Sequence, residues 1–237
     1  MLLFRILKAA SLIFFVVSLC QHARGDTIYD VTLNTTPLVG HPAGPFYVEL
    51  AVTDGSGVGD GNNTVSLSSF FLGGGSALGS PFTFGGVSGS LENGVTITDT
   101  SFLNVFSEQF TPGLQLSFSV DMTSNDDLGG IPDGLTLYIL DSSGVPLPTL
   151  APFGDYFLGA DISSSGPNFS LYGSDPSRAP SDGNPVTIAA PTITPMSTVP
   201  EPSSISLVCA PLVGIVLIRS YGFIRFPNLK SRRKSIG

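Results

Sequence analysis

Apolar and polar residues alternate with a period of two along most of the chain between residues 26 and 198. The longest run is LQLSFSVDM at 114–122, and shorter runs are YDVTL at 29–33, VTI at 95–97 and LTLYIL at 135–140. Because successive side chains of a strand point to opposite faces, this pattern predicts half-buried β-strands. Further strands are expected over 46–53 and 64–72.

Turn-forming clusters separate these runs at Asp54 to Gly57, Gly73 to Gly75, Glu92 to Gly94 and Asp141 to Gly144. Asn93-Gly94 lies between two apolar-containing runs and predicts a hairpin with a two-residue turn. No stretch longer than a turn or two has the period of an amphipathic helix. About ten short strands joined by such turns predict an all-β fold, a β-sandwich of jelly-roll kind, over residues 26–190.

Residues 1–25 have the layout of a signal peptide, in which basic residues precede an apolar stretch and a short polar region follows. The basic residues are Arg5 and Lys8. The residues expected at the cleavage site are Ala23, Gly25 and Asp26. Small residues three and one positions before the cut are what signal peptidase requires. We therefore expect a signal helix that takes the chain through the Sec machinery and is removed before Asp26.

A lipoprotein is the alternative for this end of the chain, with Cys20 as the acylated residue. Leu19 precedes Cys20, at the position where a lipobox has Gly or Ala. The signal peptide with cleavage before Asp26 is therefore the favoured interpretation.

The C-terminal end of the chain also has the layout of a sorting signal. A Thr/Pro linker is expected over 191–198, followed by a short motif at Val199, Pro200, Glu201, Pro202 and Ser203. The apolar positions of the expected membrane helix are Ile205, Leu207, Val208, Leu212, Val213, Ile215, Val216, Leu217 and Ile218. The basic residues after it are Arg219, Arg225, Lys230, Arg232, Arg233 and Lys234. Lys and Arg beside an apolar span stay cytoplasmic, which would leave residues 26–190 outside.

These three parts in this order resemble the PEP-CTERM sorting signal, with Pro200-Glu201-Pro202 as its tripeptide and 199–237 as its extent. The resemblance implies processing by an exosortase, a membrane-embedded cysteine peptidase or transpeptidase of Gram-negative bacteria that make exopolysaccharide. The product would be released or joined to the cell surface. A plain C-terminal anchor without processing is the alternative.

Three segments between the two ends are similar to an uncharacterised family of β-rich PEP-CTERM proteins. They are the run from Asp26 to Leu33, Gly89-Ser90-Leu91 before the strand at 95–97, and the run from Leu137 to Gly144. The resemblance covers most of residues 26–198. It implies a shared fold and no known activity.

Charge separates the ends from the middle of the chain. Of the 18 acidic residues only Glu201 lies outside 26–198, and of the 10 Lys and Arg residues only Arg178 lies inside. Such a negative domain repels phosphate backbones, which excludes nucleic acid as a partner. It attracts cations and favours solubility outside a cell.

Few residues between 26 and 198 could carry catalysis. The two cysteines, Cys20 and Cys209, lie in the apolar ends, which excludes a thiol nucleophile and a cysteine-ligated zinc site from the domain. His41 is in a Gly-His-Pro loop, where an exposed or locally bonded imidazole is expected. Paired carboxylates could still hydrolyse a glycoside, since that chemistry needs only two acids at a set separation.

Two Gly-rich loops concentrate the oxygen ligands that Ca²⁺ prefers. One contains Asn125, Asp126, Asp127 and Asp133, and the other Asp54, Asp60 and Asn62. Neither matches the EF-hand spacing, and Asp, Asn and Gly are also ordinary turn residues. A weak structural Ca²⁺ site at Asp126, Asp127 and Asp133 and ordinary turns are both open interpretations, and no other cofactor is expected.

The first functional hypothesis is a non-enzymatic surface or extracellular-matrix protein. The second is a carbohydrate-binding module associated with exopolysaccharide. It would use Tyr47, Tyr138, Tyr156 and Tyr172 as stacking platforms, since the chain has no Trp. Core or sheet-face packing is the alternative role of these tyrosines. The third hypothesis is a weak glycoside hydrolase. Tyrosines gathered on one exposed sheet face would favour the second hypothesis, and facing carboxylates in a cleft would favour the third.

Overall fold

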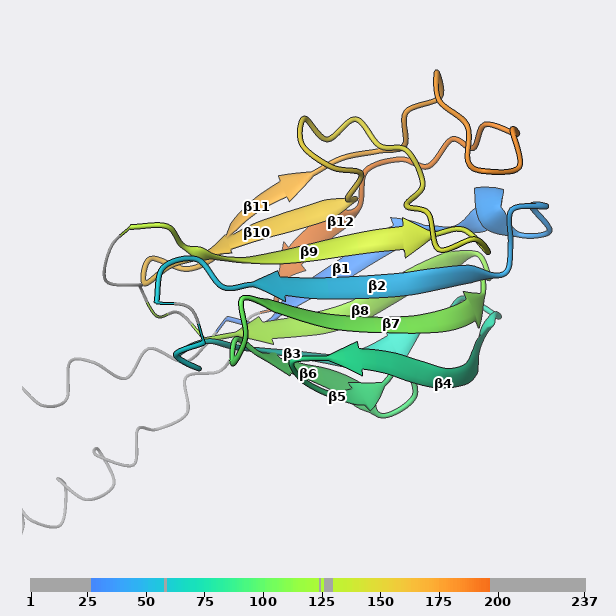
Figure 1. The fold of residues 1–237 in the computed structure, drawn as a ribbon. Coiled ribbons are helices and arrows are strands. Elements are labelled where there is room, and N and C mark those ends of the chain that lie inside the picture. Colours follow the sequence, from blue (N-terminus) through green and yellow to red (C-terminus); the bar gives the residue numbers. More distant parts are fainter. Residues whose placement is uncertain (1–26, 58, 124, 126–129, 197–237) are drawn as a thin grey trace, which may run out of the picture. The chain divides into compact units, whose positions relative to one another are not determined.

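The computed structural model describes residues 27–57, 59–123, 125 and 130–196, and residues 26–198 form one compact unit. Two antiparallel six-stranded sheets face each other in this unit as the layers of a β-sandwich (Figure 1). The all-β prediction is thereby confirmed. The signal helix and the membrane helix that the sequence predicts lie outside the described residues.

Sheet A contains, in spatial order, β12 (Thr192–Pro195), β1 (Tyr29–Asn34), β8 (Gln115–Met122), β3 (Thr64–Phe71), β6 (Gly94–Thr98) and β5 (Gly86–Ser90). Sheet B contains β11 (Asn168–Leu171), β10 (Leu158–Ile162), β9 (Asp133–Leu140), β2 (Phe46–Thr53), β7 (Leu103–Thr111) and β4 (Ser76–Phe84). A short 3₁₀ helix, η2 (Thr36–Leu38), links β1 to β2.

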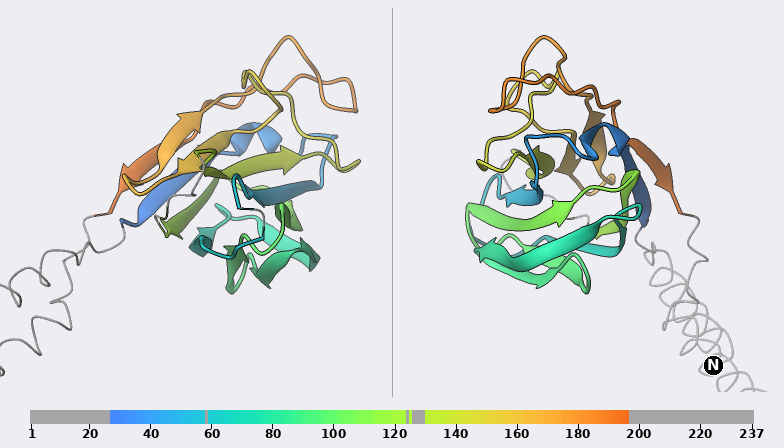
Figure 2. Two further views of the ribbon diagram at one scale, coloured as in Figure 1. Left: turned by 60° about the vertical axis from the view of Figure 1, so that its left-hand side comes forward. Right: turned by 90° about the vertical axis from the view of Figure 1, so that its right-hand side faces the viewer.

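The strands pair as a nested series, β1 with β8, β2 with β7 and β3 with β6, all antiparallel. β5 follows β4 along the chain but pairs with β6 in sheet A. β9, β10 and β11 extend sheet B beyond β2, and β12 extends sheet A beyond β1. Figure 2 shows the same layers from two other directions and the long loops that follow β9 and β11 lying together.

The alternating side chains of the strands form the core between the sheets. In β8 the inward Leu116, Phe118 and Val120 are buried, while Ser117 and Ser119 between them are half-buried on the outer face. The largest fully buried aromatic side chains are Phe46, Phe106, Phe110 and Phe157. Burial of apolar area at about 25 cal/mol per Å² makes this layer the main source of stability.

Two local expectations need correction. The linker expected over 191–198 contains β12, whose Thr192, Ile193 and Thr194 pair with β1, because β-branched residues suit an edge strand and Pro195 comes last. The hairpin at Asn93-Gly94 exists, but Gly94 already pairs with Ser90, so the turn comprises residues 91–93. Gly94 has a φ of 86°, a conformation that favours glycine.

Candidate functional site

Three connections meet at the end of the sandwich where β2 finishes and β9 begins, on the left of Figure 1. The amide of Asp54 donates to Phe102 O at 3.0 Å, and that of Asp99 donates to Asn63 O at 3.2 Å. The amide of Ser56 donates to Ile131 O at 3.1 Å. These bonds hold the β2–β3 loop against the β6–β7 connection and the residues that precede β9.

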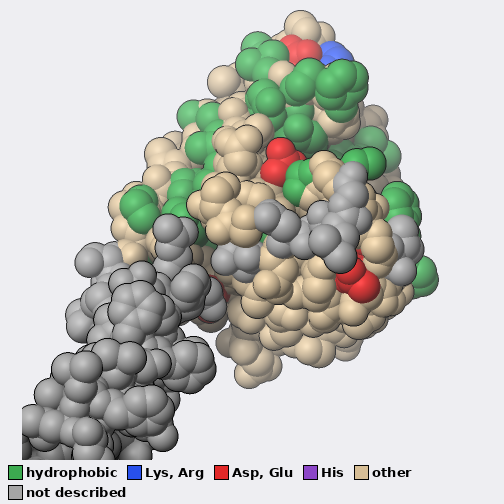
Figure 3. Space-filling model, turned by 90° about the vertical axis from the view of Figure 1, so that its left-hand side faces the viewer, with side chains coloured by type: hydrophobic (Ala, Val, Ile, Leu, Met, Phe, Trp, Pro, Cys, Tyr) green, Lys and Arg blue, Asp and Glu red, His purple; other side chains and the backbone are tan. Residues whose placement is uncertain are grey.

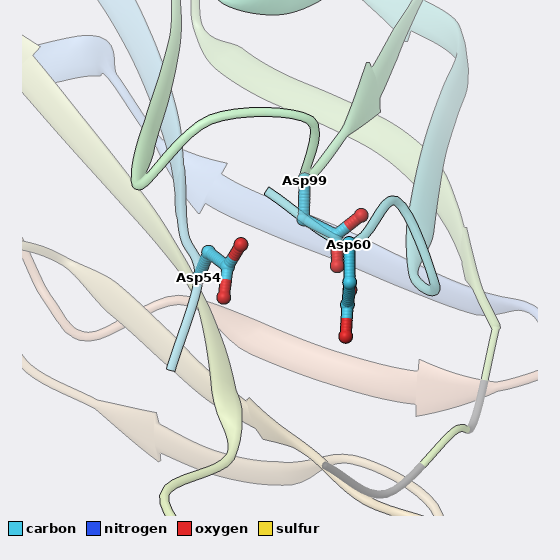
Figure 4. A group of neighbouring side chains, drawn as sticks. All are labelled: Asp54, Asp60 and Asp99. Carbon is cyan, nitrogen blue, oxygen red and sulfur yellow. The ribbon is translucent and has the colours of Figure 1, made fainter. Parts of the chain in front are cut away.

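Three aspartates gather at this meeting point (Figure 4). One carboxylate oxygen each of Asp54, Asp60 and Asp99 lies within 4.8 Å of the others. We call these residues the Asp cluster. Asp54 follows β2 and Asp99 follows β6, and their side chains are 1% and 0% exposed, whereas Asp60 in the β2–β3 loop is exposed. The cluster is thus buried on two sides and open to solvent on the third.

Backbone amides bind one side of each buried carboxylate. Oδ2 of Asp54 accepts a hydrogen bond from the amide of Gly59, and Oδ2 of Asp99 accepts one from the amide of Asn63 at 3.1 Å. No donor among the described residues lies within hydrogen-bond distance of the buried Oδ1 of Asp99. The described part of the chain therefore leaves one buried carboxylate oxygen of the cluster, Oδ1 of Asp99, without a hydrogen bond.

Asp133, the first residue of β9, lies beside the cluster and is also buried. Its Oδ1 accepts from the amide of Gly55 at 2.8 Å, and its Oδ2 accepts from Nδ2 of Asn63 at 2.7 Å. Burial, reinforced by the charges of Asp133 and Asp60, raises the pKa of Asp99 to about 7, although the Asn63 amide opposes the shift. The surroundings of Asp99 thus disfavour its ionised form.

The loop geometry depends on glycine at two points. A Cβ on residue 55 would lie 2.2 Å from Ile131 O, so only glycine lets the β2–β3 loop approach the residues before β9 so closely. Gly59 has a φ of 79°, in the left-handed region, and its amide points back to Asp54. These glycines place the two loops, and with them the cluster.

The structure brings together residues from both loops that the sequence proposed for Ca²⁺. Asp54 and Asp60 are in the cluster, and Asn62 donates to both oxygens of Asp60 at 3.1 Å from its amide and its Nδ2. Asp133 adjoins the cluster, while Asp126 and Asp127 lie outside the described residues. Sequence reasoning missed Asp99. The available indication was an acidic residue at the end of the alternating run at 95–97.

A second feature is the outer face of sheet B, which carries four half-buried tyrosines: Tyr47, Tyr138, Tyr156 and Tyr172. We call this surface the tyrosine face. The rings of Tyr138 and Tyr156 meet edge to face with centroids 6.2 Å apart, as do those of Tyr156 and Tyr172 at 5.5 Å. Tyr47 is one diagonal step from Tyr138, since Glu49 lies opposite Tyr138 in the register.

Polar groups lie beside these rings. Nε2 of Gln109 donates to the Tyr47 hydroxyl at 3.2 Å, and burial raises the pKa of Glu49 above its usual value. A shallow hollow of about 240 Å³ adjoins Tyr47. It is lined by Tyr47, Ser107, Leu140, Ser142, Ser143 and Gly144. The face therefore combines aromatic surface with hydrogen-bonding groups.

The basic side chains of the domain are engaged at the opposite end of β9. Arg178 donates through Nε to Asp175 at 3.0 Å and through Nη1 to Asp155 at 3.2 Å. Nδ1 of His41 accepts from the amide of Ala43 at 3.2 Å, a locally bonded imidazole as expected. In Figure 3, which looks onto the end with the Asp cluster, blue appears on the described surface only at the top, beside red.

No family model, curated protein or solved structure matches this chain. Among the described residues, no helix has the length and apolar character needed to cross a bilayer. The sorting motif, the cleavage site, the membrane helix and the basic tail that the sequence predicts all lie outside those residues.

Proposed function

We propose that this chain is an exported, non-enzymatic protein of the cell surface or extracellular matrix. The observation that carries the proposal is the arrangement of one folded acidic domain, residues 26–198, between a signal-peptide-like start and a PEP-CTERM-like end. The high net negative charge of the domain favours solubility outside the cell. The amide of Met196 donates to Ile28 O at 2.8 Å, so the first and last described residues of the domain lie side by side.

Tag separation tests this proposal. The protein carries epitope tags on both sides of residues 199–203 and is expressed in its host with and without the exosortase. We expect loss of the C-terminal tag only when the exosortase is present, with the domain appearing outside the cell. Retention of both tags in the membrane fraction under both conditions would leave a plain tail-anchored protein and refute the sorting proposal.

A second candidate function is binding of exopolysaccharide, and the tyrosine face specifically favours it. Aromatic rings present flat apolar surface to the CH groups of a sugar, while Gln109, Glu49 and the hydroxyls around the hollow offer hydrogen bonds to its OH groups. Four tyrosines on one outer sheet face also meet the condition set above for this hypothesis. The fold alone would be a weaker argument, since sandwiches serve many functions.

Affinity electrophoresis in the host's purified exopolysaccharide tests the second candidate. We expect Tyr138→Ala and Tyr156→Ala to weaken retardation about tenfold, as loss of a central aromatic contact does. Phe153→Ala is the matched control, because Phe153 is 84% exposed and lies in the loop after β9. Equal retardation of all variants, with unchanged circular dichroism, would rule out binding at this face.

The hydrolase alternative has less support. The Asp cluster brings three carboxylates together, but Asp54 and Asp99 are only 1% and 0% exposed. A glycoside cannot reach buried carboxylates, whereas a glycosidase needs its two acids on either side of the bond.

The nested strand pairing supports a further proposal about the fold, namely that the sandwich is of jelly-roll kind with β5 displaced to sheet A.

A further inference from the structure

The Asp cluster concentrates negative charge at one end of the sandwich. One oxygen from each of its three carboxylates lies within 4.8 Å of the others, and two of the three residues are buried. The one arginine of the domain, Arg178, is bound to Asp155 and Asp175 at the other end of β9. Buried charges in proteins are either paired or bound to metal ions. A cation from solution would compensate the charge of the cluster.

The buried oxygen of Asp99 is an independent indication of a ligand. Oδ1 of Asp99 is fully buried, has no hydrogen-bond donor among the described residues and belongs to the carboxylate that faces Asp54 and Asp60. An unsatisfied buried acceptor is costly, and native structures nearly always give it a partner. A bound cation would supply that partner.

The dimensions of the cluster suit Ca²⁺. Two oxygens bound to one Ca²⁺ at about 2.4 Å lie no more than about 4.8 Å apart. We propose that Asp54, Asp60 and Asp99 bind one Ca²⁺ ion, which fastens the β2–β3 loop to the end of β6. The exposed side of Asp60 leaves room for water ligands and an entry path. The inference is independent of the proposed function.

Asp133 serves in this site as a positioning residue. Both of its oxygens are already used, by the amide of Gly55 and by Nδ2 of Asn63. Asn63 in turn donates its amide to Asp99. Asp133 therefore holds in place both the loop that carries Asp54 and the residue that orients Asp99, without needing to bind the ion itself.

Thermal unfolding of the full chain in a non-ionic detergent tests the proposal. Because the chain has no Trp, unfolding is followed by circular dichroism or calorimetry. Extracellular Ca²⁺ modules have a Kd of about 0.1–1 mM, so 10 mM CaCl₂ gives about 10 to 100 times Kd and raises Tm by about 3–11 °C over the chelated protein. NaCl of matched ionic strength is the reference. Calorimetric titration with CaCl₂ should give one site.

Substitutions identify the ligands. Asp99→Asn and Asp54→Asn are expected to remove the Ca²⁺-dependent rise in Tm, while Glu92→Gln, which removes an exposed charge in the β5–β6 turn, keeps it. Asp99→Asn also relieves repulsion in the calcium-free protein, so it should remain folded. A rise of less than about 1 °C in the wild type, or an equal rise in wild type and Asp99→Asn, would overturn the proposal.

Discussion

The two ends of strand β9 bury a carboxylate in opposite ways. Asp141, just after β9, accepts hydrogen bonds from the amides of Ser143 at 2.9 Å, Val145 at 3.1 Å and Ser181 at 3.1 Å, and from the Ser181 hydroxyl. Near the start of β9, Asp99 accepts one from the described residues, from Asn63, and is close to further carboxylates. Both side chains are 0% exposed, so burial alone does not distinguish them.

The difference lies in what surrounds each charge. At Asp141 burial raises the pKa, but the bonds from Ser181, Val145 and Ser143 outweigh it and hold the pKa below its usual value. At Asp99 burial and neighbouring carboxylates raise the pKa to about 7. The chain thus supplies its own donors at one end of the sandwich. At the other end the amide of Asn63 is the one donor to Asp99 among the described residues, and the adjacent carboxylates add acceptors, which is the chemistry of a cation site.

Removing the Asp141 carboxylate should have the largest effect on stability. Asp141→Ala removes the acceptor of the amides of Ser143, Val145 and Ser181, whose part-buried bonds to this carboxylate contribute about 1 kcal/mol each. We expect a loss of about 3 kcal/mol in the free energy of unfolding, measured by urea denaturation. A loss below about 0.5 kcal/mol would show that water replaces the carboxylate and that the two ends are less different than proposed.

The pH dependence of stability should separate the two ends next. In the calcium-free protein the raised pKa of Asp99 means that its stabilising, protonated form is fully present below about pH 4 and lost as pH rises through about 7. For Asp141, whose pKa is lowered, the stabilisation is present above its ordinary value of 3.8 and is lost as pH falls below it. We therefore expect Tm to be highest between about pH 4 and pH 6.

The acid and alkaline limbs of that profile can be assigned by substitution. Asp99→Asn should flatten the fall in Tm between about pH 5 and pH 8 and leave the fall at lower pH unchanged. Saturating Ca²⁺ should do the same in the wild type at neutral pH. If Asp99→Asn leaves the fall above pH 5 intact, another group causes it.

A smaller gain should come from Asp99→Asn itself. At pH 8 without Ca²⁺ the substitution removes one of several adjacent negative charges, so we expect it to stabilise the protein by about 1 kcal/mol, measured by urea denaturation. Asp141→Asn, which introduces an amide where only an acceptor is wanted, should destabilise it. If the two Asp→Asn substitutions change the free energy of unfolding in opposite directions, the difference between the two ends is established. Changes in the same direction would contradict it.

Much of the fold could be predicted from the alternation of apolar and polar residues, but not all of it. The runs at 29–33 and 135–140 lie in β1 and β9 as expected, and the run at 114–122 lies in β8 except for Leu114, which precedes the strand and is exposed. β7 was missed because Asn104 and Glu108 face the interior, which conceals the period, and Glu108 is accommodated by the amide of Leu91 at 2.7 Å. β12 was missed because its Pro-rich surroundings favour a linker.

The cluster could be predicted only in part for a different reason. Asp54 and Asp60 are close in the sequence, and their loop alone suggested oxygen ligands. Asp99 joins them because β3 and β6 pair Thr64 with Thr98, which brings the residue after β6 beside the residues before β3. This proximity depends on strand order and register, so it could not be predicted from the spacing of residues in the sequence.

The smallest effect should come from the ion pairs of Arg178, at the Asp141 end. Arg178 bridges Asp155 and Asp175, but its side chain is 47% exposed, and solvent screens such pairs. Arg178→Gln should therefore lower Tm by no more than about 2 °C, and the difference should vanish in 1 M NaCl. A larger loss that persists in salt would mean that the bond from Nη2 to Thr149 O, at 2.6 Å, orders the loops around Asp141. The Asp141 end would then also depend on a cation, one that the chain itself provides.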